Sequence, residues 1–191
     1  MADLKHVAGL DQFKAALEQL PKNIARNVLR QAVAAGANKI HLQAVDLAPE
    51  YEGDDPRPDK GLIKRAIYHK QIPELSSELV QTYFVGVRRG SKTPVKMKGQ
   101  KVIVDAYYWT WLEFGHYYQP PNTLARGKGS TAKNREIRAA LRAGGGAIWV
   151  EPRSFMRPAF ALAKDAALKA ITDYFERNIP REAAKLGLVM K

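Results

Sequence analysis

The stretch KNIARNVLRQAVAAGANKIHLQAVDLA, residues 22–48, decides the fold of this chain. Its apolar side chains recur every three or four positions, which is the spacing of a helix with one buried face. The stripe consists of Leu29, Val33, Ala37, Ile40, Ala44 and Leu47. The abundant alanine and Gly36 add little side-chain bulk, so we expect another element to approach this helix closely. Pro49 ends the helix.

Two more helices are predicted, one on each side of this stretch. Residues 11–20 form a short amphipathic helix with Asp11 as its cap, and Pro21 separates it from the long helix. The C-terminal helix runs from about residue 158 to 178, with Pro158 in its first turn. Its apolar face is formed by Phe160, Ala163, Ala167, Ile171 and Tyr174. We expect Pro180 to end or kink this helix.

The middle of the chain has the composition of strands. Residues 79–88 and 101–105 are rich in β-branched and aromatic side chains, and 90–100 between them would form an elongated hairpin tip. The aromatic stretch 106–115 fits either a strand or a helical turn. We therefore predict one α+β domain over residues 1–191, with a small, mostly antiparallel sheet around 79–105 packed against the two long helices.

Composition restricts the class of protein. The chain has 191 residues, which suits one domain with its own core. It contains no cysteine, so disulfides and thiolate metal sites are excluded. No apolar run approaches the roughly 20 residues that a membrane helix needs. The start of the chain does not have the pattern of a signal peptide, so we expect the protein to be made in a cytoplasm and to have no membrane partner.

Most of the net charge of +12 lies in two short basic arms, residues 86–101 and 121–146. The first carries six basic residues and no acidic one, and the second carries six basic residues and Glu136. The basic residues are Arg88, Arg89, Lys92, Lys96, Lys98 and Lys101 in the first arm, and Arg126, Lys128, Lys133, Arg135, Arg138 and Arg142 in the second. We expect these arms to bind something acidic, either nucleic acid or a protein surface, although both could simply be solvated loops.

The sequence offers no positive argument for an enzyme. It contains no phosphate-binding loop, no nucleophile elbow and no dinucleotide fingerprint. The four histidines do not share a metal-binding spacing. Glu113 and His116 could share a site, but an aromatic turn with incidental polar groups is the simpler interpretation. We therefore expect no catalytic residues, no cofactor and no metal.

Aromatic residues gather in one stretch and are missing from the arms. Seven of them fall within residues 107–118. Most are expected in the core, but they exceed what one face can bury, so some are expected at a subunit interface. Because neither arm contains an aromatic residue, recognition by base stacking is not expected. The arms are therefore expected to contact phosphates or an acidic protein surface.

Three motifs occur in a characteristic order. The first is Ala48-Pro49 followed by Gly61-Leu62-Ile63-Lys64-Arg65-Ala66-Ile67, and the second is Leu112-Glu113-Phe114-Gly115. The third is Ser154-Phe155-Met156-Arg157-Pro158-Ala159 at the start of the C-terminal helix. With this order and spacing, nearly the whole chain resembles the tail-component family of lambdoid, long-tailed phages. Its members are neck proteins, also described as tail-completion, head–tail joining or minor tail proteins.

The resemblance implies a structural protein of the virion at the head–tail junction, without catalysis or cofactor. It implies a homo-oligomeric, hexameric ring whose partners are other neck and tail proteins, such as a tail terminator, a head-closure protein or a connector ring. Genomic DNA passing through the channel could touch the arms. Family members often have Thr where this chain has His116, and they tend to be shorter, so the arms look like extensions of the family pattern.

Two other functions stay open at this point. A non-specific DNA-binding protein could use the same two arms, and its affinity would fall steeply with salt. A nuclease could use Glu113, His116 and the acidic loop at residues 50–59. Gene neighbours encoding portal, capsid and tail-tube proteins would favour the neck interpretation over both.

Overall fold

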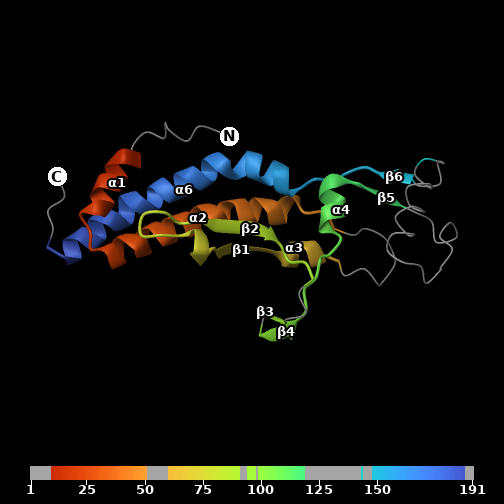
Figure 1. Ribbon diagram of the computed structural model, residues 1–191, viewed down its shortest axis with the longest axis horizontal. Helices are drawn as coiled ribbons and strands as arrows, with labels where there is room; N and C mark the ends of the chain where they lie inside the picture. Colours follow the sequence, from red (N-terminus) through yellow and green to blue (C-terminus); the bar gives the residue numbers. More distant parts are fainter. Residues whose placement is uncertain are drawn as a thin grey trace.

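Two long antiparallel helices form the body of the molecule in this computed structural model, which describes residues 10–50, 60–90, 94–97, 99–118, 143 and 148–187 (Figure 1). Helix α2 spans Lys22–Leu47 and helix α6 spans Met156–Lys185. The short helix α1, Leu10–Glu18, lies at the end of the body where α2 begins and α6 finishes. The predicted N-terminal and central helices are confirmed. Because α1 begins at Leu10, Asp11 lies in its first turn and not at the predicted cap position. Within the described part of the chain, no helix is long and apolar enough to cross a membrane.

Small side chains allow α2 and α6 to pack closely. The buried residues of α2 include Ala25, Ala32, Gly36, Ala37 and Ala44, and those of α6 include Ala159, Ala163, Ala167 and Ala183. The two helices approach closely at Gly36. A Cβ atom placed there would lie 2.8 Å from two side-chain carbons of Ile171 and 3.1 Å from the carbonyl oxygen of Ala167. The close partner predicted from the alanines and Gly36 is therefore α6.

Replacing Gly36 with leucine is expected to destabilise the protein by about 2 kcal/mol, because the new side chain would force the two helices apart. The gain in helix propensity, about 1 kcal/mol, offsets only part of that cost. Chemical denaturation of both proteins measures the difference. Asn38→Leu is the matched control, since Asn38 is exposed on the same helix and should tolerate leucine. Equal stabilities of the two variants would contradict the close packing at Gly36.

The main sheet consists of strands β1, Ile67–Gln71, and β2, Tyr83–Val87, paired antiparallel with Ile67 opposite Val87. It packs on α2, and helix α3, Leu62–Ala66, leads into it. The α+β class is confirmed. The predicted strand 79–88 is four residues shorter at its start, because residues 79–82 belong to the loop after the short 3-10 helix η2, Pro73–Leu75.

The predicted partner of that strand was wrong. Residues 101–105 do not pair with β2; instead strand β4, Gln100–Val102, pairs with β3, Val95–Met97, in a separate two-stranded ladder. This hairpin projects away from the body (Figure 1). The position beside β2 is taken by β1, which continues directly from α3 and so reaches the sheet without a long connection. A strand-like composition identifies a strand but not its partner.

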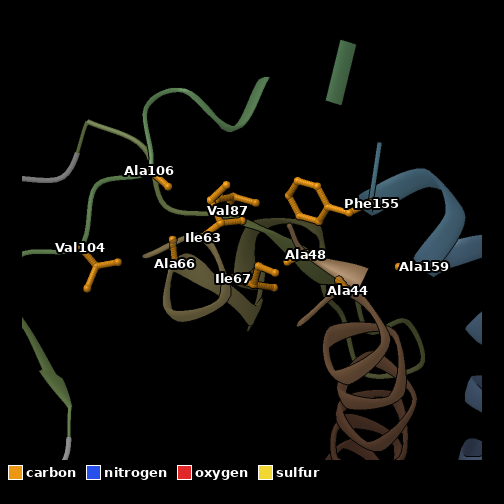
Figure 2. Packing of buried hydrophobic residues seen from close by; sticks show 10 residues of the cluster. All are labelled: Ala44, Ala48, Ile63, Ala66, Ile67, Val87, Val104, Ala106, Phe155 and Ala159. Carbon is orange, nitrogen blue, oxygen red and sulfur yellow. The ribbon is translucent and has the colours of Figure 1, made fainter. Parts of the chain in front are cut away.

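Two hydrophobic clusters hold the body together at its two ends. One joins α1, the first half of α2 and the end of α6, and it includes Leu17, Val28 and Phe175. The other surrounds Phe155 at the start of α6 (Figure 2). Its buried members are Ala44, Ala48, Ile63, Ala66, Ile67, Val87, Val104, Ala106, Phe155 and Ala159. This second cluster brings the three sequence motifs to one end of the molecule.

Helix α6 is longer than predicted at both ends. It begins at Met156 rather than near residue 158, and it continues through Pro180 to Lys185. Proline removes one backbone hydrogen bond, but burial of Ile179 and Ala183 in the α1–α2–α6 cluster holds the helix on both sides of it. Tertiary packing thus outweighs the local preference to stop at Pro180.

Candidate assembly surfaces

Among the described residues, Glu113 is the only charged side chain that is buried. It lies in helix α4, Trp109–Phe114, and only 1% of it is exposed. One carboxylate oxygen, Oε2, accepts hydrogen bonds from the backbone amides of Phe155 and Met156 at 2.8 and 3.0 Å. The other, Oε1, accepts from the backbone amide and the side-chain Nε of Arg157, both at 3.1 Å. Glu113 therefore caps the start of α6 from 42 residues away.

This cap accounts for every free amide of the first turn of α6. A helix leaves its first four amide groups without partners inside the helix. At the start of α6 three of these amides bond to Glu113, and the fourth position is Pro158, which has no amide hydrogen. The N-cap residue Phe155 has no side-chain acceptor, so it cannot cap the helix itself. The negative carboxylate also faces the positive end of the helix dipole.

The surroundings of Glu113 keep it ionised. Burial alone would raise the pKa of its carboxyl group, because a charge is costly away from water. The hydrogen bonds from the amides of Phe155, Met156 and Arg157 and from the Arg157 side chain outweigh burial, so the pKa lies below its ordinary value. All these bonds favour the charged form. The carboxylate is thus fixed as an acceptor of hydrogen bonds.

The backbone next to Glu113 makes further hydrogen bonds to the start of α6 and the residues before it. The Glu113 carbonyl oxygen accepts hydrogen bonds from Ser154 Oγ at 2.7 Å and from Arg157 Nη2 at 2.9 Å. The amide of Arg153 donates to the carbonyl oxygen of Leu112 at 2.7 Å. The motif at 112–115 and the motif at 154–159 are therefore one hydrogen-bonded unit, which we call the Glu113 joint.

The possible site of Glu113 and His116 does not form among the described residues. The carboxylate of Glu113 points toward the start of α6, whereas the ring of His116 stacks on Trp111 with 5.4 Å between ring centres. His116 belongs to strand β5, His116–Tyr118, which follows Gly115. The two side chains thus serve different contacts, one as a helix cap and one in an aromatic stack.

Aromatic side chains cover the end of the molecule beyond the joint. Strand β5 pairs antiparallel with β6, Ile148–Val150, with Tyr117 opposite Trp149. Their rings meet edge to face, 4.9 Å apart. The exposed apolar residues here, which we call the aromatic end, are Tyr107, Trp111, Phe114, Tyr117, Tyr118, Ile148, Trp149 and Val150. Tyr108, Trp109 and Leu112 pack against the core instead. The aromatic run is therefore divided between core and surface, in agreement with the sequence.

The first basic arm is anchored at its base. The guanidinium of Arg88 lies 4.4 Å from the centre of the Tyr68 ring, so this residue belongs to the body and not to a reaching arm. The carbonyl oxygen of Arg88 accepts from the amide of Ala106, and the amide of Gly90 donates to Asp105 Oδ1 at 2.8 Å. Arg89 is exposed beside these contacts.

The outer part of the first arm contains the β3–β4 ladder. Its register places Lys96 directly opposite Lys101, and Lys101 is exposed. Lys92 and Lys98 lie outside the described residues, as do all six basic residues of the second arm: Arg126, Lys128, Lys133, Arg135, Arg138 and Arg142. Of residues 121–146 the structure describes Ala143 alone, and this residue is helical.

The fold brings together two histidines that the sequence keeps apart. The rings of His41 on α2 and His69 on β1 meet edge to face with 5.1 Å between their centres. Burial, and then the nearby His69, lower the pKa of His41. Nothing in sequence spacing predicts this pair, because the two residues lie on different elements. No group of three or more possible metal ligands occurs in the described ranges.

No family model, no curated protein and no solved structure matches this chain. The resemblance to phage tail-component proteins therefore rests on the three sequence motifs, and it stays a prediction. The geometry defines a helical body with a buried capped joint, an exposed aromatic end and a projecting basic hairpin.

Proposed function

We propose that this chain is a structural virion protein of a tailed phage, acting at the head–tail junction to join or terminate the tail during assembly. The observation that supports this most is the Glu113 joint. Two of the three motifs that carry the resemblance meet there through six hydrogen bonds to Glu113 itself. Motifs that depend on each other physically are a stronger signal than the same motifs scattered over a surface.

The exposed surfaces also suit assembly. The aromatic end is rich in Tyr and Trp, which are enriched where proteins meet. In this proposal the helical body forms a homo-oligomeric, hexameric ring, and the arms reach the neighbouring neck or tail rings. The partners are a tail terminator, a head-closure protein or a connector ring, and the function involves no catalysis and no cofactor.

Disruption of the gene in its source phage tests this function directly. We expect electron microscopy of the resulting particles to show filled heads beside separate tails. Expression of the chain from a plasmid should restore joined, infectious particles. Normally joined particles without the gene product would refute the neck proposal.

The first basic arm can be tested by itself. Replacement of residues 91–99 by a short Gly-Ser linker should leave thermal stability nearly unchanged, because the anchoring contacts of Arg88 and Gly90 remain. We expect the variant to complement the disrupted gene at least about tenfold less well, since contacts between the arm and a partner contribute to assembly. Infectious titre of the complemented phage is the measurement.

A charge variant separates the reach of this arm from its charge. Lys96→Gln combined with Lys101→Gln keeps the hairpin length and removes the opposed lysine pair. If acidic contacts drive joining, this variant should fail in complementation like the linker variant. Full titre from both variants would remove the arm from the proposal.

The opposed lysines also favour a second candidate, a non-specific DNA-binding protein. This candidate predicts duplex binding whose affinity falls steeply with salt, because bound lysines release counterions from the phosphates. Fluorescence anisotropy with a labelled duplex at several salt concentrations measures it. Loss of that slope in the Lys96→Gln, Lys101→Gln variant would assign the binding to the hairpin.

A further inference from the structure

Two histidine rings lie in the contact between the long helix α2 and the main sheet. His41 comes from α2 and His69 from β1, where Val85 on β2 is its register partner. Both side chains are half-buried, and their rings meet edge to face with 5.1 Å between their centres. We call this pair the histidine contact. Because histidine ordinarily changes its charge near neutral pH, a contact of this kind can respond to pH.

One ring nitrogen of each histidine is buried without a hydrogen-bond partner. The atoms are Nδ1 of His41 and Nδ1 of His69, and no described residue offers either of them a hydrogen bond. A neutral imidazole carries one hydrogen, which can sit on Nε2 and leave Nδ1 bare, whereas a protonated imidazole carries a hydrogen on both nitrogens. Protonation would therefore place a buried N–H group of a charged ring where it has no acceptor, and such an unpaired group is costly.

Repulsion between the two rings adds to this cost. Two positive charges on rings 5.1 Å apart repel each other, and they do so more strongly in a half-buried site than in bulk water. Burial is the larger cause of the lowered pKa of His41, and the nearby His69 is the second cause. The closed contact therefore favours a neutral His41.

The charged groups on the surrounding elements do not compensate a charge on the pair. The charged side chains that α2, α3, β1 and α6 carry alongside it are exposed to water, namely Lys39, Asp46, Arg65, Lys70, Lys164 and Asp165. On α3, Lys64 is paired with Glu50 at 2.9 Å, and β2 contributes Tyr83 as its titratable residue. None of these groups is a cause of the lowered pKa of His41, on which only His69 acts by its charge. Among the described residues, no carboxylate therefore stabilises a charged His41.

The histidine contact lies just outside the buried end of the sheet. At that end Ile67 and Val87 belong to the second hydrophobic cluster, and Gly86 is also buried. The remaining residues of both strands are half-buried or exposed. We call residues 69–71 and 83–85 the outer half of the sheet. Because its contacts with α2 bury less apolar surface than those of the buried end, the outer half can open separately.

The loop beyond the outer half adds only a weak hold. Glu78 in this loop pairs with Lys22 at the start of α2 at 3.2 Å, but the Glu78 side chain is 56% exposed and the Lys22 side chain is 83% exposed. An ion pair in water contributes little to stability. Leu79 and Val80 of the same loop are also exposed. The outer half thus depends on half-buried contacts with α2, and the histidine contact is one of them.

We propose that the histidine contact is a pH-sensitive switch, which holds the outer half of the sheet on α2 while both rings are neutral and releases it when they are protonated. Release frees the buried Nδ1 atoms to bond to water and lets the two charges separate. The buried end stays in the second hydrophobic cluster, so the sheet would open about Ile67 and Val87. This inference goes beyond the proposed function and does not depend on it.

The release should occur in a defined pH range. When the outer half is open, His41 has its ordinary pKa of 6.5, whereas the pKa lies lower in the closed contact. The open form therefore binds the proton first as the pH falls, so release is absent above about pH 6.5 and grows from there toward the pKa of the closed contact. Glu113 keeps its charge until the pH falls below about 4.5, so the two effects occupy separate ranges.

Hydrogen exchange followed by NMR at about pH 7.5 and about pH 5.0 tests the switch in the purified chain. After correction for the pH dependence of the chemical exchange rate, we expect the amides of the outer half to exchange at least about fivefold faster at the lower pH. The amide of Val28, in the cluster at the other end of α2, should keep its protection. Titration of the His41 ring signals in the same samples should give a pKa below 6.5.

Variants that cannot titrate identify the source of the effect. His41→Phe keeps an aromatic ring at the contact and His41→Gln places a smaller neutral side chain there, so one of the two should fold if the other does not. In either variant the acceleration should fall below about twofold. His116→Phe is the matched control, because His116 Nδ1 is also buried without a partner but its ring stacks on Trp111, away from α2. This control should keep the full acceleration.

Several results would overturn the switch. The outer half could exchange at the same corrected rate at both pH values, or the acceleration could persist in the folded His41 variants. Val28 could lose its protection together with the outer half, which would indicate general unfolding in acid. A His41 ring that titrates at or above pH 6.5 would also contradict the proposal.

Discussion

Replacing Glu113 with alanine is expected to lower the free energy of unfolding by about 3 kcal/mol. The variant loses the remote cap of α6 and leaves three first-turn amides without their acceptor. Loss of a helix cap costs about 1 kcal/mol, and each hydrogen bond to a charged group contributes about 1.5–3 kcal/mol. Urea denaturation followed by circular dichroism measures the change. A loss below about 1 kcal/mol would contradict the central role of the joint.

Two further variants identify which bonds of the joint matter. Glu113→Gln keeps the shape and one acceptor oxygen, so it should cost less than Glu113→Ala. Arg157→Ala removes the guanidinium but leaves the backbone amides on Glu113. Because the Arg157 side chain is 63% exposed, its ion pair should contribute less than about 1 kcal/mol. A larger loss from Arg157→Ala than from Glu113→Ala would transfer the main role from the cap to the ion pair.

The contribution of Glu113 should depend on pH in a defined direction. The pKa of Glu113 in the folded protein lies below its ordinary value of 4.5, so the unfolded chain binds the proton first as the pH falls. The stabilisation is therefore complete above about pH 4.5 and is lost as the pH falls from there toward the folded-state pKa. The stability difference between the unchanged chain and Glu113→Gln should shrink in that range. A difference that grows on acidification would contradict the lowered pKa.

The helices could be predicted from the sequence because apolar residues repeat along a single segment. The predicted face of α6 was wrong at Phe160, which is 58% exposed. Gly36 and the alanines of α2 also predicted the close approach of another element, without showing that this element is α6. Contacts between residues of different segments leave no repeating pattern in the sequence. The strand 67–71 contains Lys70 and Gln71 and lacks a continuous apolar run, so its pairing with β2 is fixed by tertiary contacts on α2 rather than by local composition.

The role of Glu113 was missed for a similar reason, although a signal was present. A glutamate in an aromatic run has no helix next to it to cap, and only the fold brings it to α6. The start of α6 nevertheless has Phe155 at the capping position and Pro158 in the first turn. Such a helix leaves its first-turn amides to water or to a distant acceptor. Glu113, an acidic residue within an aromatic run, was a candidate for that acceptor.

Gly115→Ala is expected to release the β5–β6 ladder from the body. Gly115 has φ of +74°, a conformation that residues with a side chain rarely adopt. An added Cβ would lie 2.5 and 2.8 Å from ring carbons of Trp149 and 2.9 Å from the carbonyl oxygen of Val150. Backbone strain and overpacking together cost about 3 kcal/mol, which exceeds what a marginal two-stranded ladder can sustain.

The indole N–H signal of Trp149 in a two-dimensional NMR spectrum reports this release, and Trp149→Phe assigns it. In Gly115→Ala we expect this signal to move to the position of a solvated indole, while the signal of Trp109, which packs against the core, stays. Gly90→Ala is the control. Gly90 also has a positive φ, of +66°, but nothing lies within 4 Å of an added Cβ. Its substitution should therefore cost only about 1–2 kcal/mol of backbone strain and leave the Trp149 signal in place.

An unmoved Trp149 signal in Gly115→Ala would mean that the ladder does not depend on the close contact between glycine and indole. The aromatic end would then be held by its own ring contacts, and the Leu112–Gly115 motif would serve the cap of α6 alone.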